Sequence, residues 1–373
     1  MIAFFTVVMI SYFLLLLLLI YGWNKTKALG SISSANERSF TVIIPFRNEA
    51  IAIHHLIRSL TELNYPTNKF EVILVNDHSE DNSENVVKSL IHDKPNFSLV
   101  NLEEGDTGKK NAITKAVELA KGEFIATTDA DCVVPPDWLQ IIDASFNSDS
   151  VKMVFGGVRL REGSFFSRLQ AIEFSSLIGS GASTLGLGFF SMCNGANLAF
   201  RKNAFEGVNG YQGNLEVPSG DDEFLARKIA NAFPDSIRFL KTKEAVVITK
   251  PAHSLKAFFN QRLRWAGKWK YNSSWSTKLL AIQILMVQMV FIGLILMASI
   301  QNDPLWLFVL LIGVKILLET MVIYPVARFL GAKWSWFAFF VLQLIYPFYV
   351  IAIGIMSQGM TYSWKGRSLS HKV

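Results

Sequence analysis

The sequence has little cysteine and lacks several familiar binding motifs. Its two cysteines, Cys132 and Cys193, form neither a CxxC pair nor a His–Cys metal pattern, so we expect no structural disulfide. The P-loop pattern GxxxxGK[ST] is absent. A net charge of +6, from 36 basic and 30 acidic residues, could suggest a nucleic-acid partner, but no nucleic-acid motif accompanies it. Attraction to anionic lipid headgroups explains the charge equally well.

Charge is missing altogether from long apolar stretches, and 51% of the residues are hydrophobic. Residues 1–24 carry no charged side chain and are long enough to cross about 30 Å of hydrocarbon as a helix. A cleaved signal peptide is the alternative, but no basic stretch precedes the apolar run and no small-residue cleavage pattern follows it. We expect an anchor at 1–24 and a second membrane region at 279–364 with about three spans.

The distribution of basic residues predicts the orientation in the membrane. Lys25 and Lys27 follow the first apolar stretch, and most basic residues lie in the middle of the chain, which should therefore face the cytoplasm, at the inner membrane if the source is bacterial. The loop 301–304, without Lys or Arg, then falls outside. A simple fourth crossing would leave the basic tail 365–373 on the wrong side. Because the last uncharged stretch is long and contains Pro347, it either crosses, bends back or lies at the interface.

The middle of the chain, residues 40–250, alternates short β-rich runs with helical runs, which is typical of an α/β domain with a mostly parallel sheet covered by helices. The expected strands are 40–45, 71–75, 97–102 and 124–128, and the expected helices are 49–63, 82–92, 109–119 and 222–232. Ligands bind beyond the carboxyl ends of the strands in such sheets. Glu49, Asp77, Asp129 and Asp131 follow strand ends, which predicts one shared pocket.

Two acidic motifs and one basic-aromatic motif suggest chemistry. Alternation in an extended segment places Asp129 and Asp131 on one side, where they can share a divalent ion with a diphosphate. Asp221 and Asp222 open a helix, and a plain helix cap is the alternative for them. We expect residues 251–275 to form an amphipathic interface helix in which Gln261, Arg264 and Trp265 share one arc. Arg264 could bind a diphosphate and Trp265 could stack on a sugar, whereas a basic membrane anchor is the alternative.

Taken in order, the motifs resemble those of family 2 glycosyltransferases, which are inverting enzymes with a GT-A fold, a Rossmann-like α/β domain. The pattern is closest to that of ceramide glucosyltransferase-like and processive polysaccharide synthase-like members. The motifs are VIIPFRNE at 42–49, VNDHSED at 75–81, Gly108-Lys109, DAD at 129–131, GDD at 220–222 and QRLRW at 261–265.

The resemblance implies a role for each matching residue. The nucleoside would contact Pro45, Glu49 and Asp77, although Asn76 replaces the first aspartate of the usual pair and the segment is also good turn chemistry.

Phosphate or ribose would meet Lys109, whereas the adjacent Lys110 is read as an ordinary solvated residue at a helix start. Asp131 would bind the metal, Mn²⁺ or Mg²⁺, together with Asp129, which lies nearer the donor sugar. Asp222 would be the general base.

The acceptor side would include Asp221, Gln261 and Trp265, and the loop around Gly195 and Asn197.

These observations predict a membrane-bound transferase that moves a hexose or N-acetylhexosamine from a UDP-sugar to a lipid acceptor at the cytoplasmic leaflet. A processive synthase of the cellulose, chitin or hyaluronan type, with a glycan acceptor, is the alternative. A non-catalytic membrane scaffold is a third hypothesis. Lys315 and Glu319, one turn apart in an expected span, either neutralise each other or line an acceptor passage.

Overall fold

The structure is a computed structural model that describes residues 2–28, 38–271, 274–300, 305–357, 362–365 and 367–369. It divides into two compact units. The helical unit comprises Met1–Lys25, Glu162–Ser191 and Pro251–Val373, and the sheet unit comprises Thr26–Arg161 and Met192–Lys250. The expected tail 365–373 lies mostly outside the described residues.

The sheet unit is built on a seven-stranded sheet with the order β3-β2-β1-β4-β7-β5-β8. All neighbouring pairs in it are parallel except those of β7, which is antiparallel to β4 and β5. The strands are β1 (Phe40–Phe46), β2 (Phe70–Asn76), β3 (Phe97–Asn101), β4 (Phe124–Thr127), β5 (Met153–Gly156), β7 (Leu198–Arg201) and β8 (Ile237–Leu240). The predicted mostly parallel α/β fold is confirmed.

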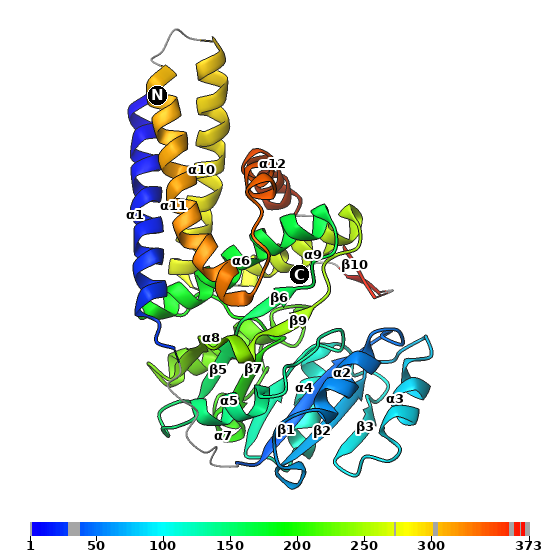
Figure 1. The fold of residues 1–373 in the computed structure, drawn as a ribbon. Coiled ribbons are helices and arrows are strands. Elements are labelled where there is room, and N and C mark those ends of the chain that lie inside the picture. The colour runs from blue at the N-terminus through cyan, green and yellow to red at the C-terminus, as the bar shows by residue number, and fades with distance from the viewer. Residues whose placement is uncertain are drawn as a thin grey trace. The chain divides into compact units, whose positions relative to one another are not determined.

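Helices cover this sheet on its faces (Figure 1). They are α2 (Ile53–Thr61), α3 (Ser83–Ile91), α4 (Lys109–Leu119), α5 (Trp138–Ser145), α7 (Lys202–Gly207) and α8 (Asp221–Ala232), with short 3₁₀ turns at Thr67–Lys69 and Lys243–Ala245. A small second sheet pairs β6 (Val158–Leu160) with β9 (Val247–Thr249). Because helices cover the parallel strands, β1 and β2 read as nearly continuous apolar runs and not as alternating ones.

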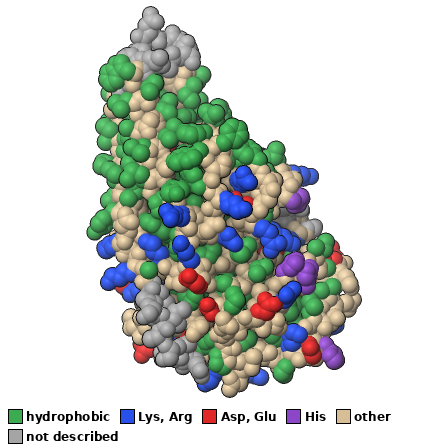
Figure 2. All heavy atoms as spheres, in the orientation of Figure 1, with side chains coloured by type: hydrophobic (Ala, Val, Ile, Leu, Met, Phe, Trp, Pro, Cys, Tyr) green, Lys and Arg blue, Asp and Glu red, His purple; other side chains and the backbone are tan. Residues whose placement is uncertain are grey.

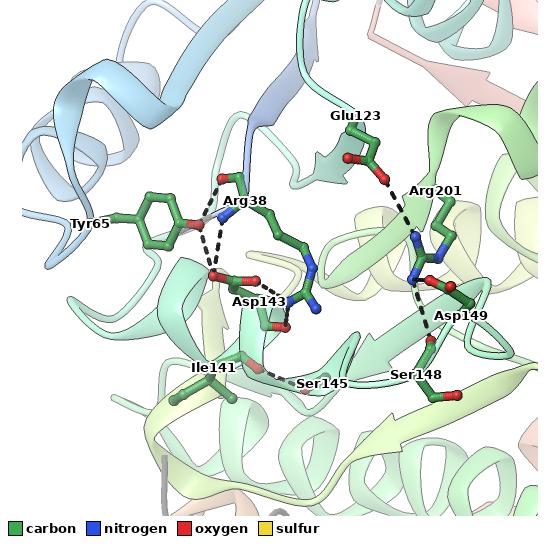
Figure 3. A network of polar contacts seen from close by, with 9 residues as sticks. All are labelled: Arg38, Tyr65, Glu123, Ile141, Asp143, Ser145, Ser148, Asp149 and Arg201. Atoms are coloured by element: carbon green, nitrogen blue, oxygen red, sulfur yellow. Dashed lines mark hydrogen bonds and ion pairs between the residues drawn. The ribbon is translucent and has the colours of Figure 1, made fainter. Parts of the chain in front are cut away.

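Two arginines anchor the amino-terminal edge of the parallel strands (Figure 3). Arg38, just before β1, donates to Asp143 of α5 at 2.6 Å, and the Tyr65 hydroxyl donates to the same carboxylate at 2.9 Å. Arg201, which pairs with the first residue of β4, reaches Asp149 at 3.1 Å. These contacts lie at the edge opposite to the one where the strands end, so they stabilise the sheet without occupying the predicted pocket.

The helical unit contains the helices that are long and apolar enough to cross a membrane, judged by length and composition: Ala3–Lys25, Thr277–Leu296, Phe308–Leu330 and Trp336–Met356. They belong to α1 (Ile2–Lys25), α10 (Trp275–Ile300), α11 (Leu305–Leu330) and α12 (Trp336–Met356). The unit also holds α6 (Phe165–Gly186), α9 (Leu255–Gly267), the 3₁₀ turn Lys268–Tyr271, and a hairpin of β10 (Tyr362–Trp364) and β11 (Arg367–Leu369). Hydrophobic side chains cover much of the visible surface of the long helices (Figure 2).

Helix α6 packs into the helical unit, so the expected domain 40–250 is interrupted at Glu162–Ser191. Small residues allow the close approach. A Cβ added at Gly22 of α1 would lie 2.2 Å from the Ser183 carbonyl oxygen of α6, and one at Gly179 would lie 2.8 Å from a methyl group of Val326 in α11. The backbone of α1 therefore approaches that of α6 closely at Gly22, and the side chain of Val326 occupies the space beside Gly179.

Helix α12 runs in a different direction from the other long helices. In Figure 1, α1, α10 and α11 are seen along their lengths, whereas α12 is seen nearly end-on. A polar cluster joins it to them, because Gln343 of α12 donates to Glu319 of α11 at 2.6 Å, and Tyr12 of α1 donates to the same carboxylate at 2.6 Å. Lys315 pairs with Glu319 at 2.8 Å, which favours the neutralising role for these two charges.

Candidate active site

Lys109 gathers the acidic residues of two motifs at the carboxyl edge of the sheet. It is the first residue of α4, directly after Gly108, whose φ of 92° is accessible to glycine at little cost. The Lys109 ammonium lies 2.7 Å from Asp129 and 3.0 Å from Asp221. Burial lowers the pKa of Lys109, but the carboxylates of Asp129, Asp221 and Asp222 more than offset this and hold it well above its ordinary value. Lys109 is therefore a fixed cation at the centre of the acidic group.

Gly195 brings the acceptor-side loop into the same cluster. Its N–H donates to Asp222 Oδ2 at 3.0 Å, and its carbonyl accepts from the Thr127 hydroxyl at the end of β4 at 3.1 Å. A Cβ at this position would lie 3.1 Å from Asp221 Oδ2 and 3.2 Å from Lys109 Nζ. The absence of a side chain is thus what lets the loop approach the charged groups.

Asp222 is held at a helix start by backbone N–H groups. Helix α8 begins at Asp221 after Gly220, which is left-handed with φ of 82°. Asp222 Oδ1 accepts from the N–H of Glu223 at 2.7 Å, in addition to the Gly195 contact at Oδ2. These two backbone bonds help to fix the orientation of the Asp222 carboxylate. The helix dipole favours the ionised form.

Asp129 and Asp131 form the group best suited to a metal ion. Their carboxylates and the Cys132 thiol offer ligand atoms that lie within 4.8 Å of one another. Burial, and next the charge of Asp129, raise the pKa of Asp131 to about 6, whereas burial raises the pKa of the Cys132 thiol well above its usual value. A thiol is a soft donor, so the two carboxylates are the better ligands in this group for a hard ion. Such oxygen donors fit a hard divalent ion such as Mg²⁺ or Mn²⁺.

The residues expected to hold the nucleoside line the adjacent part of the same edge. Asp77 follows β2, is only 2% exposed, and accepts from the N–H of Gly108 at 3.1 Å. Pro45 lies near the end of β1 and pairs with Val75, and the N–H of Glu49 donates to Ser83 at 2.7 Å. Because Gly108 precedes Lys109, the Asp77 contact links this part of the edge to the acidic cluster.

Asn197, which is expected to help shape the acceptor side, uses its polar atoms inside the sheet unit. It is fully buried, its amide donates to the carbonyls of Gly157 and Ala245 at 2.9 and 2.8 Å, and its oxygen accepts from the Trp138 indole at 2.9 Å. These contacts use its polar atoms within the protein. Asn197 therefore shapes the sheet beneath the loop and leaves the acceptor contact to other residues.

Lys110 is a residue whose role the sequence did not reveal. It is 5% exposed, and its ammonium donates to the carbonyls of Asn214 and Val217 at 2.6 and 2.8 Å and lies over the ring of Phe224. The reading of Lys110 as a solvated residue is wrong. It fixes the segment that leads to Gly220 and the acidic pair, and only a contact far along the chain could have shown this.

The residues of the QRLRW motif lie on α9 in the helical unit. Gln261 accepts from Arg262 at 2.8 Å, and the Trp265 ring lies 4.2 Å from the Arg262 guanidinium carbon. Arg264 is half-buried, and among the described residues no side chain forms an ion pair with it. Arg262 and Leu263 are buried.

Comparisons with known proteins find similar sequences and a similar fold. Residues 41–208 match the family described as Glycosyl transferase family 2. Poly-beta-1,6-N-acetyl-D-glucosamine synthase of Staphylococcus aureus is 26% identical over 253 residues, which are 66% of this chain and 57% of that protein. Beta-monoglucosyldiacylglycerol synthase of Trichormus variabilis is 25% identical over 244 residues, 63% of this chain and 50% of that protein.

Among solved structures, the mannosyltransferase PcManGT from Pyrobaculum calidifontis, in complex with GDP-Man and Mn²⁺, has a TM-score of 0.58. It is 20% identical, and the match covers 95% of this chain and 96% of that one. The sheet and this likeness define a GT-A fold. Residues 41–208 form a family 2 glycosyltransferase domain. The chain spans about half the length of the curated relatives it matches.

Proposed function

We propose that this protein is a membrane-bound, inverting glycosyltransferase that moves a hexose or N-acetylhexosamine from a UDP-sugar to a lipid acceptor at the cytoplasmic leaflet. The observation that carries the proposal is the cluster in which Lys109 contacts Asp129 and Asp221 while the Gly195 loop holds Asp222. A general base, a fixed cation and a pair of carboxylates for a divalent ion meet at one edge of the sheet.

The reaction is a single displacement. Asp222 accepts the proton of the acceptor hydroxyl as the acceptor oxygen attacks the anomeric carbon. A bond forms between these two atoms while the bond from the anomeric carbon to the diphosphate oxygen breaks, and UDP departs with the electron pair. Attack from the face opposite the leaving group inverts the configuration.

Several charged groups are proposed to offset the negative charge of the diphosphate. A divalent ion bound by Asp131 and Asp129 would neutralise negative charge on the leaving group. Lys109 holds Asp129 and Asp221 in place and supplies a fixed positive charge beside them. We propose that Arg264 of α9 adds a second cation for the diphosphate, and that Gln261 and Trp265 contact the acceptor or the transferred sugar.

Pro45, Glu49 and Asp77 are proposed to bind the nucleoside. Gly195 and Asp221 are proposed to form the acceptor side next to Asp222. The contact of Asp77 with Gly108 supports this division, because it joins the nucleoside residues to the start of α4, where Lys109 begins the phosphate side.

The acceptor and orientation are inferred from the helical unit. We propose that α1, α10 and α11 cross the membrane, that the sheet unit faces the cytoplasm, and that α12 lies near the interface. The direction of α12 in Figure 1 supports this assignment, which keeps the basic residues after α12 on the same side as Lys25. A lipid acceptor suits an enzyme embedded in this way, and one relative is named as a synthase of a diacylglycerol glycolipid.

A processive polysaccharide synthase is the second candidate, because another relative is named as a poly-N-acetylglucosamine synthase. The two functions differ in product size. The purified protein in lipid nanodiscs should be supplied with a panel of UDP-sugars, Mn²⁺ or Mg²⁺ and lipid extract, and the products analysed by mass spectrometry. One sugar on one lipid supports the proposal, whereas a ladder of sugar additions would replace it with the synthase.

A further inference from the structure

Arg262 lies inside the QRLRW motif at a position where the spacing QxxRW does not specify a residue type. It is nevertheless a buried polar residue of the helical unit. Its side chain is 4% exposed, and its partner Glu173 on α6 is 5% exposed. A pair of this kind is costly to bury unless geometry and hydrogen bonding are good.

The Arg262 guanidinium forms hydrogen bonds through its N–H groups and packs against aromatic rings through its planar faces. Its Nε donates to Glu173 Oε1 at 3.1 Å and its Nη2 donates to Glu173 Oε2, which makes a two-pronged ion pair. Its Nη1 donates to Gln261 Oε1 at 2.8 Å. Its carbon lies 4.2 Å from the Trp265 ring and 4.6 Å from the Phe258 ring. One side chain thus touches both Gln261 and Trp265.

Neighbouring helices hold this pair from the other side. The hydroxyl of Tyr349 on α12 donates to Glu173 Oε1 at 3.3 Å, and the ring of Tyr349 packs against Phe258. Phe174, next to Glu173, packs against Trp265 with ring centroids 6.0 Å apart. Helix α9 is therefore held to α6 by the Arg262–Glu173 ion pair and to α12 by Tyr349.

We propose that Arg262 and Glu173 are positioning residues that set the side-chain conformations of Gln261 and Trp265, with Tyr349 tying the pair to α12. A planar guanidinium can bind a carboxylate edge-on, donate to an amide and stack on an indole at once, whereas an ammonium cannot. This inference rests on the proposed role of Gln261 and Trp265 in transfer.

The test compares Arg262→Lys with wild type. Lysine keeps the charge opposite Glu173 but loses the planar stack on Trp265 and the simultaneous contact to Gln261. We expect a thermal midpoint close to that of wild type, unchanged UDP binding, and a fall in kcat of about tenfold to a hundredfold, as for small misplacements of reacting groups. If the ion pair is purely structural, Arg262→Lys should keep the kcat of wild type, and this result would overturn the proposal.

Two further variants separate an effect on positioning from misfolding and from failure of the proposed glycosyltransferase function. Tyr349→Phe removes one hydroxyl and should lower kcat severalfold, while Lys256→Gln, at an exposed position on α9, should leave kcat unchanged. Wild-type protein without turnover of any UDP-sugar would count against the proposed function alone.

Hydrogen exchange along α9 then decides the positioning proposal. Faster exchange at 258–266 in Arg262→Lys, with no change in Lys256→Gln, supports positioning, whereas equal exchange in all three proteins contradicts it.

Discussion

The substitution Gly195→Ala should reduce activity while leaving the protein folded. The new methyl group would lie 3.1 Å from Asp221 Oδ2, 3.2 Å from Lys109 Nζ and 3.3 Å from Asp222 Cβ. These distances are shorter than ordinary contacts, so the neighbours must move by a few tenths of an ångström. The backbone at this glycine has no positive φ, so the methyl group itself is the perturbation.

The expected magnitude follows from the groups that move. A displacement of about 1 Å in a reacting group can cost about a hundredfold in rate. Smaller shifts that affect the base and the fixed cation together should therefore cost about tenfold in kcat, which corresponds to about 1.4 kcal/mol. The loss of folding stability should stay near 1 kcal/mol, because the side chains around the methyl group are polar and partly exposed.

The assay is UDP release under saturating donor and acceptor, with thermal unfolding measured in parallel. Gly163→Ala is a matched control, because a Cβ there meets nothing within 4 Å and the residue is exposed. We expect this control to keep wild-type kcat. If Gly195→Ala also keeps it, the loop does not set the geometry of the cluster and the reasoning fails.

Other predictions concern pH, packing and topology. The pKa of Asp131 is raised to about 6, so the folded protein binds that proton more tightly than the unfolded chain does. In EDTA, the free energy of unfolding should therefore fall as the pH rises from about 4 to about 6. The variant Asp131→Asn should flatten this part of the profile. Gly22→Ala should destabilise the helical unit by about 1–3 kcal/mol or prevent its folding, because the methyl group meets the Ser183 carbonyl. A methyl group at Gly313 meets nothing within 4 Å, so Gly313→Ala should be tolerated. Unfolding in detergent measures both effects. A single cysteine placed at Arg367 should react with an impermeant thiol reagent only when the cytoplasmic side is exposed. Labelling from the opposite side would mean that α12 crosses.

The sequence predicted the sheet well because its signals are local. Buried parallel strands read as apolar runs, and the expected strand at 71–75 corresponds to β2 at Phe70–Asn76. The expected helix at 109–119 is α4. The expectation that Asp129 lies at the ligand-binding edge followed from the rule that ligands bind beyond the carboxyl ends of the strands in such a sheet.

What the sequence could not reveal depends on contacts between distant segments. The burial of Lys110 depends on carbonyl groups more than a hundred residues away, so the local pattern at a helix start was misleading. The internal role of Asn197 depends on Trp138 and Ala245, and the pairing of Arg262 depends on Glu173. Polar residues inside a packed structure have no periodicity of their own, unlike apolar ones.

The central claim is that the acidic cluster at the sheet edge performs sugar transfer with Asp222 as the base. The most direct measurement is the rate of UDP release by wild type, Asp222→Asn and Asp93→Asn in lipid nanodiscs with Mn²⁺, a UDP-sugar and lipid extract. Asp93 is exposed and pairs only with its neighbour Lys94 among the described residues, so its substitution is the control. We expect Asp222→Asn to lose at least about a hundredfold in kcat, since general-base catalysis contributes about that much or more. Asp93→Asn should match wild type. Wild-type activity in Asp222→Asn would contradict the account.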